Sequence, residues 1–448
     1  MLFEAFKEAV IAAAKQAGIE EYELYSVEDN QSQVSTYRQE IDSFSSTVSG
    51  GVCFRCIRNG RMGYAATELL TEEQAGEIVR RAAANADLIE NDDQTCIYAG
   101  GTEYGKKETG SVSVPGSDAL VDFALRCQKA AYGVDPRVAD GTSSTAIATA
   151  STVRIYNSKG LDLENTSAFS AAYIESVVEE ANEKYSGWSF RVGALQDDIL
   201  QELAEEAVQK AVSSIGADTA ESGTYTVVFS GEQMYTLLSA FAPVFSAENT
   251  QKGLSLLDGK EGETIAADCV TLVDDPFYPG SPVQTPFDAE GAATRRKNVI
   301  EQGVLRTLLH NLKTAHKANI QTTGNASKYS YASNISVSPY SFYFAPGGQS
   351  LEELFAQAGE GIYITEIKGT HAGANPVTGD FSLESSGFLI EEGKRGRPVR
   401  SFTIAGNFFT LLKQIAAVGN DLVFDIPSGY TVYGSPSVLA EGIAVAGK

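Results

Sequence analysis

The sequence predicts an α+β protein, with a mixed α/β N-terminal region followed by a β-rich, barrel- or sandwich-like C-terminal domain. In the N-terminal half, helical and strand-like patterns occur in separate groups, which argues against a doubly wound parallel sheet. From Thr224 onward, short β-like runs separated by Gly, Pro and Asn dominate, as in barrels and sandwiches. For 448 residues we expect units at 1–110, 111–220 and 221–448, the first two packed together as one domain.

The first unit begins with an amphipathic helix at residues 3–17, which Gly18 ends. The Asn59-Gly60 pair between two strand-like runs predicts a hairpin, because both positions of that turn need positive φ. Thr71 has the sequence context of an N-cap to which the Gln74 side chain bonds back. The strand-like runs of this unit are Tyr22–Val27, Gln33–Arg38, Val52–Ile57 and Met62–Ala66.

The second unit follows a polar, Gly-rich junction at residues 91–115. A helix is expected after Ser117, strands between Ala146 and Arg191, and a second helix at 197–215. Apolar residues recur on one face of both helices, so we expect both to pack on the strands.

The third unit opens with a predicted strand at Tyr225–Phe229 and a predicted helix at Glu232–Phe245, which Pro243 is able to end. Short strands are expected after it, at Val270–Val273, Val299–Val304, Ile335–Val337, Gly361–Ile367, Ser386–Glu391 and Val399–Ala405.

The composition argues against several functions. There are 58 acidic and 34 basic residues, a formal charge of -24, and such a surface repels nucleic-acid phosphates and anionic membranes. Five cysteines are too few for a disulfide scaffold and fit a reducing cytoplasm. We see no signal peptide, and the uncharged stretch 329–351 is broken by Pro and Gly. We therefore expect a cytoplasmic protein without nucleic-acid or membrane partners.

Metal-ligand patterns are sparse. The chain has three histidines, His310, His316 and His371, and no H-E-x-x-H. The pair Cys53-x-x-Cys56 is half of a zinc knuckle without a second pair, and it lies in a strand-like run. Positions i and i+3 of a strand face opposite sides, so we expect one cysteine inward and one outward.

Two polar groups remain as candidates for substrate or partner contact. Asp288 and Glu290 would share a face if they lie on a strand, and then either bind a cation or pair with nearby arginines. The stretch 369–382 holds three glycines together with His371, Asn375 and Asp380. It is either a ligand-facing loop or a β–β connection whose polar side chains bond its own backbone.

Several segments, in order, resemble the TldD/PmbA family, once called modulators of DNA gyrase and regarded as metalloproteases. The resemblance spans almost the whole chain. The segments are GGVCFRCIRNGRMGYAAT (50–67), GKEGETIAADCVTLVDDP (259–276), PFDAEGAATRRKNVIEQGVLRTLL (286–309), GTHAGANPVTGDFSLESSGFLIEEG (369–393), PVRSFTIAGN (398–407) and GSPSVLAEGIAVAG (434–447).

The resemblance implies a role without catalysis in this chain. In the TldD branch a helix carries H-E-x-x-x-H, whose histidines bind zinc and whose Glu acts in catalysis. Here the equivalent helix is 234–249, with Ser239, Ala240 and Val244 at those three positions. The sequence is similar to the other branch, TldE or PmbA, understood as the non-catalytic half of a TldD–TldE heterodimer. Zinc is then expected on the partner subunit and not on this chain.

The resemblance also implies the substrate and leaves alternatives open. The heterodimer cleaves unfolded peptides and matures some ribosomal peptides, and family members also form homodimers. One alternative is a stand-alone peptidase with a divergent site near His371, using Asp380, or using Asp288 with Glu290. The other is a homodimeric peptide-binding protein without a proteolytic partner. Activity of the isolated chain therefore stays undecided at the level of sequence.

Overall fold

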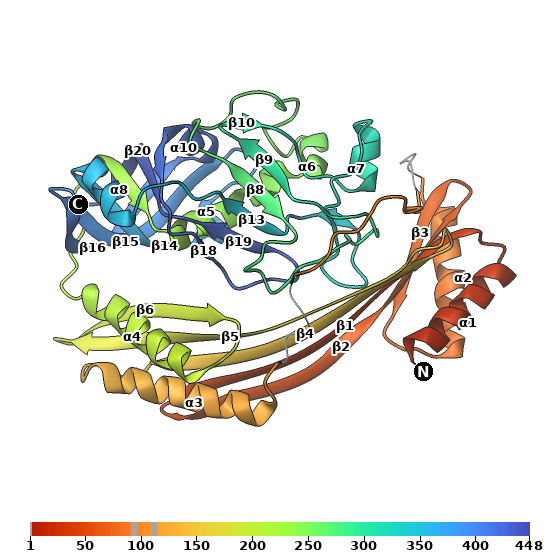
Figure 1. Ribbon diagram of the computed structural model, residues 1–448, viewed down its shortest axis with the longest axis horizontal. Helices are drawn as coiled ribbons and strands as arrows, with labels where there is room; N and C mark the ends of the chain where they lie inside the picture. The colour runs from red at the N-terminus through yellow and green to blue at the C-terminus, as the bar shows by residue number, and fades with distance from the viewer. Residues whose placement is uncertain (1, 91–95, 109–113) are drawn as a thin grey trace.

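The computed structural model describes residues 2–90, 96–108 and 114–448. A long, curved antiparallel sheet forms the N-terminal half, with strand order β3-β2-β1-β4-β5-β6 (Figure 1). The first three strands and the last three are thus joined side by side through β1 and β4. The strands are β1 (Glu21–Tyr37), β2 (Glu40–Arg58), β3 (Arg61–Thr67), β4 (Ser143–Asn157), β5 (Asp162–Glu180) and β6 (Glu183–Val192).

Four helices cover one face of this sheet in two pairs, α1 (Phe3–Gln16) with α2 (Glu72–Leu88), and α3 (Ser117–Val134) with α4 (Asp197–Ser213). Leu24 packs against the first pair and Val34 against the second. Both are even-numbered residues of β1, and alternate residues of a strand share a face. The odd-numbered Tyr25 packs instead on the C-terminal domain, so that part of the sheet is covered on both sides.

The local signals of the first unit are largely confirmed. Helix α1 ends just before Gly18, which has φ 66°, and the Asn59-Gly60 turn has φ 52° and 75°. The Thr71 side chain accepts the N–H of Gln74, although the Gln74 side chain contacts Thr67 and does not bond back. The prediction of two separate strands at 22–27 and 33–38 was wrong, because β1 runs unbroken from the first range into the second and ends at Tyr37. The predicted junction at 91–115 includes residues 91–95 and 109–113, which lie outside the described residues.

The two strand cysteines lie on opposite faces of β2, but both are buried. Cys56 packs among α1 and α2, and Cys53 packs against the C-terminal domain, with exposed fractions of 0% and 3%. The expectation of one outward cysteine was wrong, since periodicity shows which side a residue faces but not what covers that side.

The C-terminal half is β-rich and contains a closed barrel of five strands, β16-β15-β14-β7-β20, because β16 also pairs with β20. The predicted fold class is therefore confirmed. The barrel strands are β7 (Gly223–Phe229), β14 (Gly361–Lys368), β15 (Asp380–Glu391), β16 (Lys394–Asn407) and β20 (Val438–Ala446), and β17 (Ile415–Val418) pairs with β20.

A second six-stranded sheet lies beside the barrel. Its strands, in sheet order, are β10 (Val304–Leu305), β9 (Lys297–Glu301), β8 (Leu272–Asp275), β13 (Ser341–Phe344), β19 (Val432–Ser435) and β18 (Val423–Phe424). A short pair, β11 (Ala326–Ser327) with β12 (Ser336–Val337), completes the β-structure of this half within the described chain.

Helix α5 (Gly231–Phe241) packs in the largest hydrophobic cluster, together with residues of the barrel and of the second sheet. Phe241 of this helix stacks on Phe408, with ring centroids 4.6 Å apart. The other C-terminal helical segments are η1 (Ala242–Phe245, 3-10), α6 (Ala247–Gln251), α7 (Leu312–Lys317), α8 (Leu351–Ala358), α9 (Thr370–Gly373) and α10 (Phe408–Gln414). Within the described residues, every helix is too short or too polar to cross a membrane.

Candidate functional site

The helix expected at 232–245 is shorter than predicted. The Ser230 side chain caps α5 by accepting the N–H of Gln233, and the α-helix ends at Phe241. Pro243 follows, and its lack of an N–H disfavours a further α-helical turn. Residues 242–245 form the 3-10 helix η1 instead. Positions 239 and 244 therefore do not lie on one continuous α-helix.

The three positions implied for the zinc motif carry no metal ligand. Ser239 is half-buried and donates its hydroxyl to the carbonyl of Thr236 at 2.9 Å. Ala240 is partly buried against the core, and Val244 is fully buried in it. Neither of these side chains has a lone pair to offer a metal. The described parts of the chain also contain no group of three His, Cys, Asp or Glu residues suited to a metal. These residues therefore do not fit a zinc site.

The stretch 369–382 forms a loop beside α5 that is held by hydrogen bonds within the stretch and from Asn407. The Asn375 side chain accepts the N–H groups of Val377 and Thr378, and Asp380 accepts a hydrogen bond from the Asn407 amide at 2.9 Å. This bond from Asn407 lowers the pKa of Asp380. Asn375 and Asp380 thus hold the loop's shape, whereas His371 is exposed on α9, a short helix in contact with α5.

Asp288 and Glu290 lie in a buried turn and not on a strand. One oxygen of Asp288 accepts the N–H groups of Glu290 and Ala292, and its other oxygen accepts the N–H of Ala326. Burial, with the charge of Glu290 adding to it, raises the pKa of Asp288 to about 8. Its carboxyl group therefore organises the turn, and all three of these donors are backbone groups.

Glu290 connects the two halves of the molecule. One of its oxygens lies 3.4 Å from Nη1 of Arg55 on β2, and the other accepts the N–H of Leu312 at the start of α7. Arg55 also pairs with Glu23 of β1 at 2.8 Å. All three charged side chains are buried. The sequence did not single out Glu23 or Arg55, although a charged residue inside the apolar run Val52–Ile57 was a visible signal.

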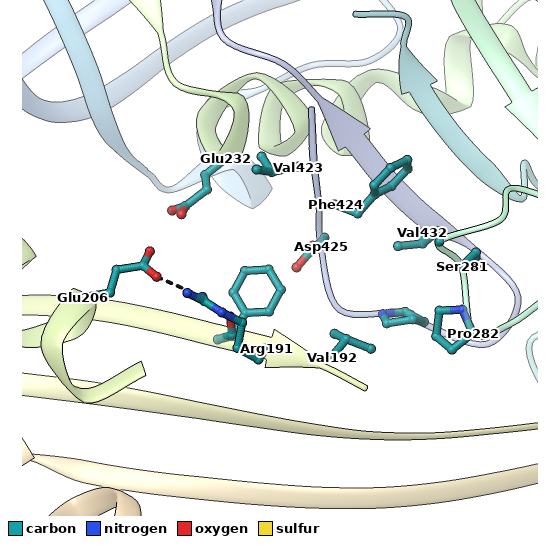
Figure 2. A pocket seen from close by; sticks show the side chains of 13 residues that line it. Arg191, Val192, Glu206, Glu232, Ser281, Pro282, Val423, Phe424, Asp425 and Val432 are labelled. Atoms are coloured by element: carbon teal, nitrogen blue, oxygen red, sulfur yellow. Dashed lines mark hydrogen bonds and ion pairs between the residues drawn. The ribbon is translucent and has the colours of Figure 1, made fainter. Parts of the chain in front are cut away.

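The other two histidines stay apart from these groups. His310 is buried just before α7, where burial lowers its pKa, and His316 lies in the last turn of that helix. A cavity of about 440 Å³ lies elsewhere, between β6, α4, the start of α5 and β18 (Figure 2). No residue spacing in the sequence indicates this cavity, because its walls come from distant segments of both halves.

Comparison with known proteins accounts for nearly the whole chain. Family models described as PmbA/TldA metallopeptidase domain 1, central domain and C-terminal domain match residues 22–86, 111–215 and 222–447. The curated relative named "Metalloprotease PmbA homolog" from Haemophilus influenzae is 27% identical over 400 residues, which are 87% of this chain and 85% of the relative.

Two solved structures have the same fold. A Thermotoga maritima protein, described as a candidate modulator of a DNA gyrase, is 31% identical with a TM-score of 0.89, covering 99% of this chain and 100% of that one. TldE from Thermococcus kodakarensis is 24% identical with a TM-score of 0.87 at the same coverage, a likeness of fold alone. With family models over all three regions, the chain belongs to the PmbA/TldD metallopeptidase family.

Proposed function

We propose that this chain is a non-catalytic, TldE/PmbA-like subunit of a cytoplasmic zinc metallopeptidase complex that cleaves unfolded peptides and matures ribosomal peptides. The observation that carries the proposal is the filling of the zinc-motif positions by Ser239, Ala240 and the fully buried Val244. Peptide hydrolysis by zinc needs a held metal and a base near its water, and the partner chain would supply both. All five cysteines are free thiols, which fits a reducing compartment.

An open sheet edge supports the proposal of a partner. Strand β3 pairs with residues 52–58 of β2, while residues 40–49 of β2 are all exposed. Residues 43–49, Ser-Phe-Ser-Ser-Thr-Val-Ser, carry no charge, and Phe44 and Val48 are 47% and 75% exposed. Soluble proteins usually protect such edges with charges, bulges or a covering element. We call residues 40–49 the β2 edge and propose that a second chain pairs with it.

The same edge also fits the alternative of a homodimeric peptide-binding protein, because an extended peptide or a second copy would use the same backbone groups. A stand-alone peptidase has less support. Asp380 already accepts a hydrogen bond from the Asn407 amide, and Asp288 accepts three backbone N–H groups.

The decisive experiment measures zinc content and cleavage of an unfolded reporter peptide. It uses this chain alone, an H-E-x-x-x-H relative alone, and the mixture. We expect zinc and full activity in the mixture, and neither in this chain alone. A mixture in which the relative's motif Glu is replaced by Gln serves as the control for activity brought in by contaminants.

Stoichiometric zinc and chelator-sensitive cleavage by this chain alone would overturn the proposal. Turnover that survives chelator but disappears in His371→Ala would establish the stand-alone peptidase. A stable homodimer that binds the reporter and does not respond to the relative would establish the binding protein.

A further inference from the structure

The cavity of about 440 Å³ combines surfaces from both halves of the molecule (Figure 2). Its charged lining residues are Arg191 of β6, Glu206 of α4, Glu232 of α5 and Asp425, which follows β18. Glu232 lies in the first turn of α5, whereas Ser239 and Ala240 lie near its other end, roughly 10 Å further along the helix axis. The cavity is thus separate from the positions implied for zinc.

The cavity holds more negative than positive charge. Glu206 pairs with Arg191 at 2.8 Å and with Lys210 at 3.0 Å, and Lys210 also reaches Glu232 at 2.7 Å. Glu206 and Glu232 are therefore both neutralised by ion pairs with Arg191 and Lys210. Asp425 lies opposite them, and its carboxyl group faces the same space (Figure 2).

Of the three acids that line the cavity, Asp425 is the one for which no Lys or Arg of the described residues forms an ion pair. One of its oxygens accepts the N–H of Ile426 at 2.7 Å, and that bond is local. Burial, with the charge of Glu232 adding to it, raises the pKa of Asp425. A cationic group entering the cavity would oppose both effects, because an opposite charge favours the ionised carboxylate.

The remaining walls are apolar. The apolar residues that line the cavity include Phe190 and Val192 of β6, Phe424 of β18, Pro282 and Val432. Ligand sites typically have this composition, with apolar walls and a few polar groups that fix orientation. The aromatic faces also suit a cation on an aliphatic stem.

We propose that this cavity binds an ammonium or guanidinium group on an apolar stem, presented as the Lys or Arg side chain of a peptide. That a peptide presents the cationic group rests on the proposed function. The preference for a cationic group rests on the cavity itself. Asp425 would meet the charged group, and Phe190 and Phe424 would flank the stem. The cavity would then favour basic residues in the peptides that this subunit engages.

The single tryptophan of the chain offers a direct readout. Trp188 lies with its ring centroid 4.8 Å from that of Phe190, which lines the cavity. Binding is measured on the full chain by Trp fluorescence and checked by calorimetry. The probes are acetyl-Ala-Ala-Lys-Ala-Ala-amide, the same peptide with norleucine in place of Lys, the same peptide with Glu, and free cadaverine.

We expect saturable binding of the Lys peptide and weaker binding of the norleucine peptide, by about tenfold or more. Asp425→Asn keeps an acceptor for Ile426 and should remove this difference, while Asp425→Glu should retain it. Asp258→Asn, an exposed carboxylate outside the cavity, is the matched control and should bind as the wild type does.

Equal binding of the Lys and norleucine peptides, or unchanged binding by Asp425→Asn, would overturn the cation site. Cadaverine binding as tightly as the Lys peptide would assign the cavity to free amines and overturn the peptide part. Neither result depends on zinc or on cleavage, so the proposed function is tested separately by the mixing experiment.

Discussion

At the scale of single residues, Asp288 shows two opposing effects on a buried carboxyl group. Burial and the neighbouring Glu290 disfavour its ionised form, while three backbone N–H groups favour it. Burial is the larger effect, so the pKa is raised to about 8. In the unfolded chain an Asp titrates near about 3.9. Between these values the folded state holds a proton that the unfolded state has lost.

This difference predicts a pH dependence for Asp288→Asn. The variant should be less stable by about 1–3 kcal/mol, because an amide N–H₂ would face a backbone N–H donor. The raised pKa means that the contribution of Asp288 to stability is lost as pH rises from about 4 to about 8. The stability advantage of the wild type over the variant should therefore shrink over that range in urea titrations. If the advantage of the wild type grows with pH, the three N–H groups lower the pKa of Asp288 more than burial raises it.

At the scale of elements, the change from α5 to η1 separates this chain from the zinc-binding pattern. Pro243 sits within the expected motif, and Val244 points into the core with no exposed surface. A ligand at position 244 would have to leave the hydrophobic cluster to reach a metal.

Restoring the motif residues should therefore not restore a zinc site. We expect Ser239→His/Ala240→Glu/Val244→His to bind no stoichiometric zinc by elemental analysis. Val244→His alone should cost about 2–4 kcal/mol, because it buries an imidazole among apolar side chains. Ser239→His, at a half-buried position, is the control and should cost less. One zinc per chain with unchanged stability would show that this segment rearranges readily.

At the scale of the whole molecule, the buried triad Glu23–Arg55–Glu290 connects the N-terminal sheet to the C-terminal domain. Removing one member leaves the others charged and buried. The resulting loss of stability is larger than the stability that the intact ion pairs contribute. The link therefore affects the stability of both halves together.

Arg55→Met should lower the free energy of unfolding by about 3–5 kcal/mol in denaturant titrations. Arg137→Met is the control, since Arg137 pairs with Asp135 at a more exposed site. There we expect the free energy of unfolding to fall by about 0–1 kcal/mol. Adding Glu23→Gln and Glu290→Gln to Arg55→Met should recover part of the loss. An effect of Arg55→Met no larger than that of the control would contradict this role.

The β2 edge, residues 40–49, bears on association of the whole molecule with a second chain. Phe44→Lys/Val48→Lys should weaken association with a partner or a second copy by about tenfold or more, since charges on an edge oppose strand pairing. Both positions are exposed, so folded stability should change by about 0.5 kcal/mol or less. Sedimentation equilibrium measures the association. Leu256→Lys, at another exposed apolar residue, is the control, and an unchanged dissociation constant for the edge variant would exclude this surface.

Local signals in the sequence determined much of the fold. The Gly18 stop, the Asn59-Gly60 turn and the Thr71 cap act through residues close in the chain, so their outcome needs no tertiary contact. Strand periodicity likewise placed Cys53 and Cys56 on opposite faces. The segregation of helices and strands, and the short C-terminal strands, predicted the fold class. The family was also visible in the order of its segments.

Tertiary structure alone decided what covers each face and which distant groups meet. Cys53 is buried because the C-terminal domain packs on that side of the sheet, which periodicity cannot reveal. Arg55 meets Glu290, and Asp425 faces Glu206, across large separations in sequence. Burial, ion pairing and cavities depend on the packing of whole elements, whereas turns and caps depend on neighbouring residues. The sequence by itself therefore determined the local turns and caps, the fold class and the family, and packing of the two halves decided the candidate sites.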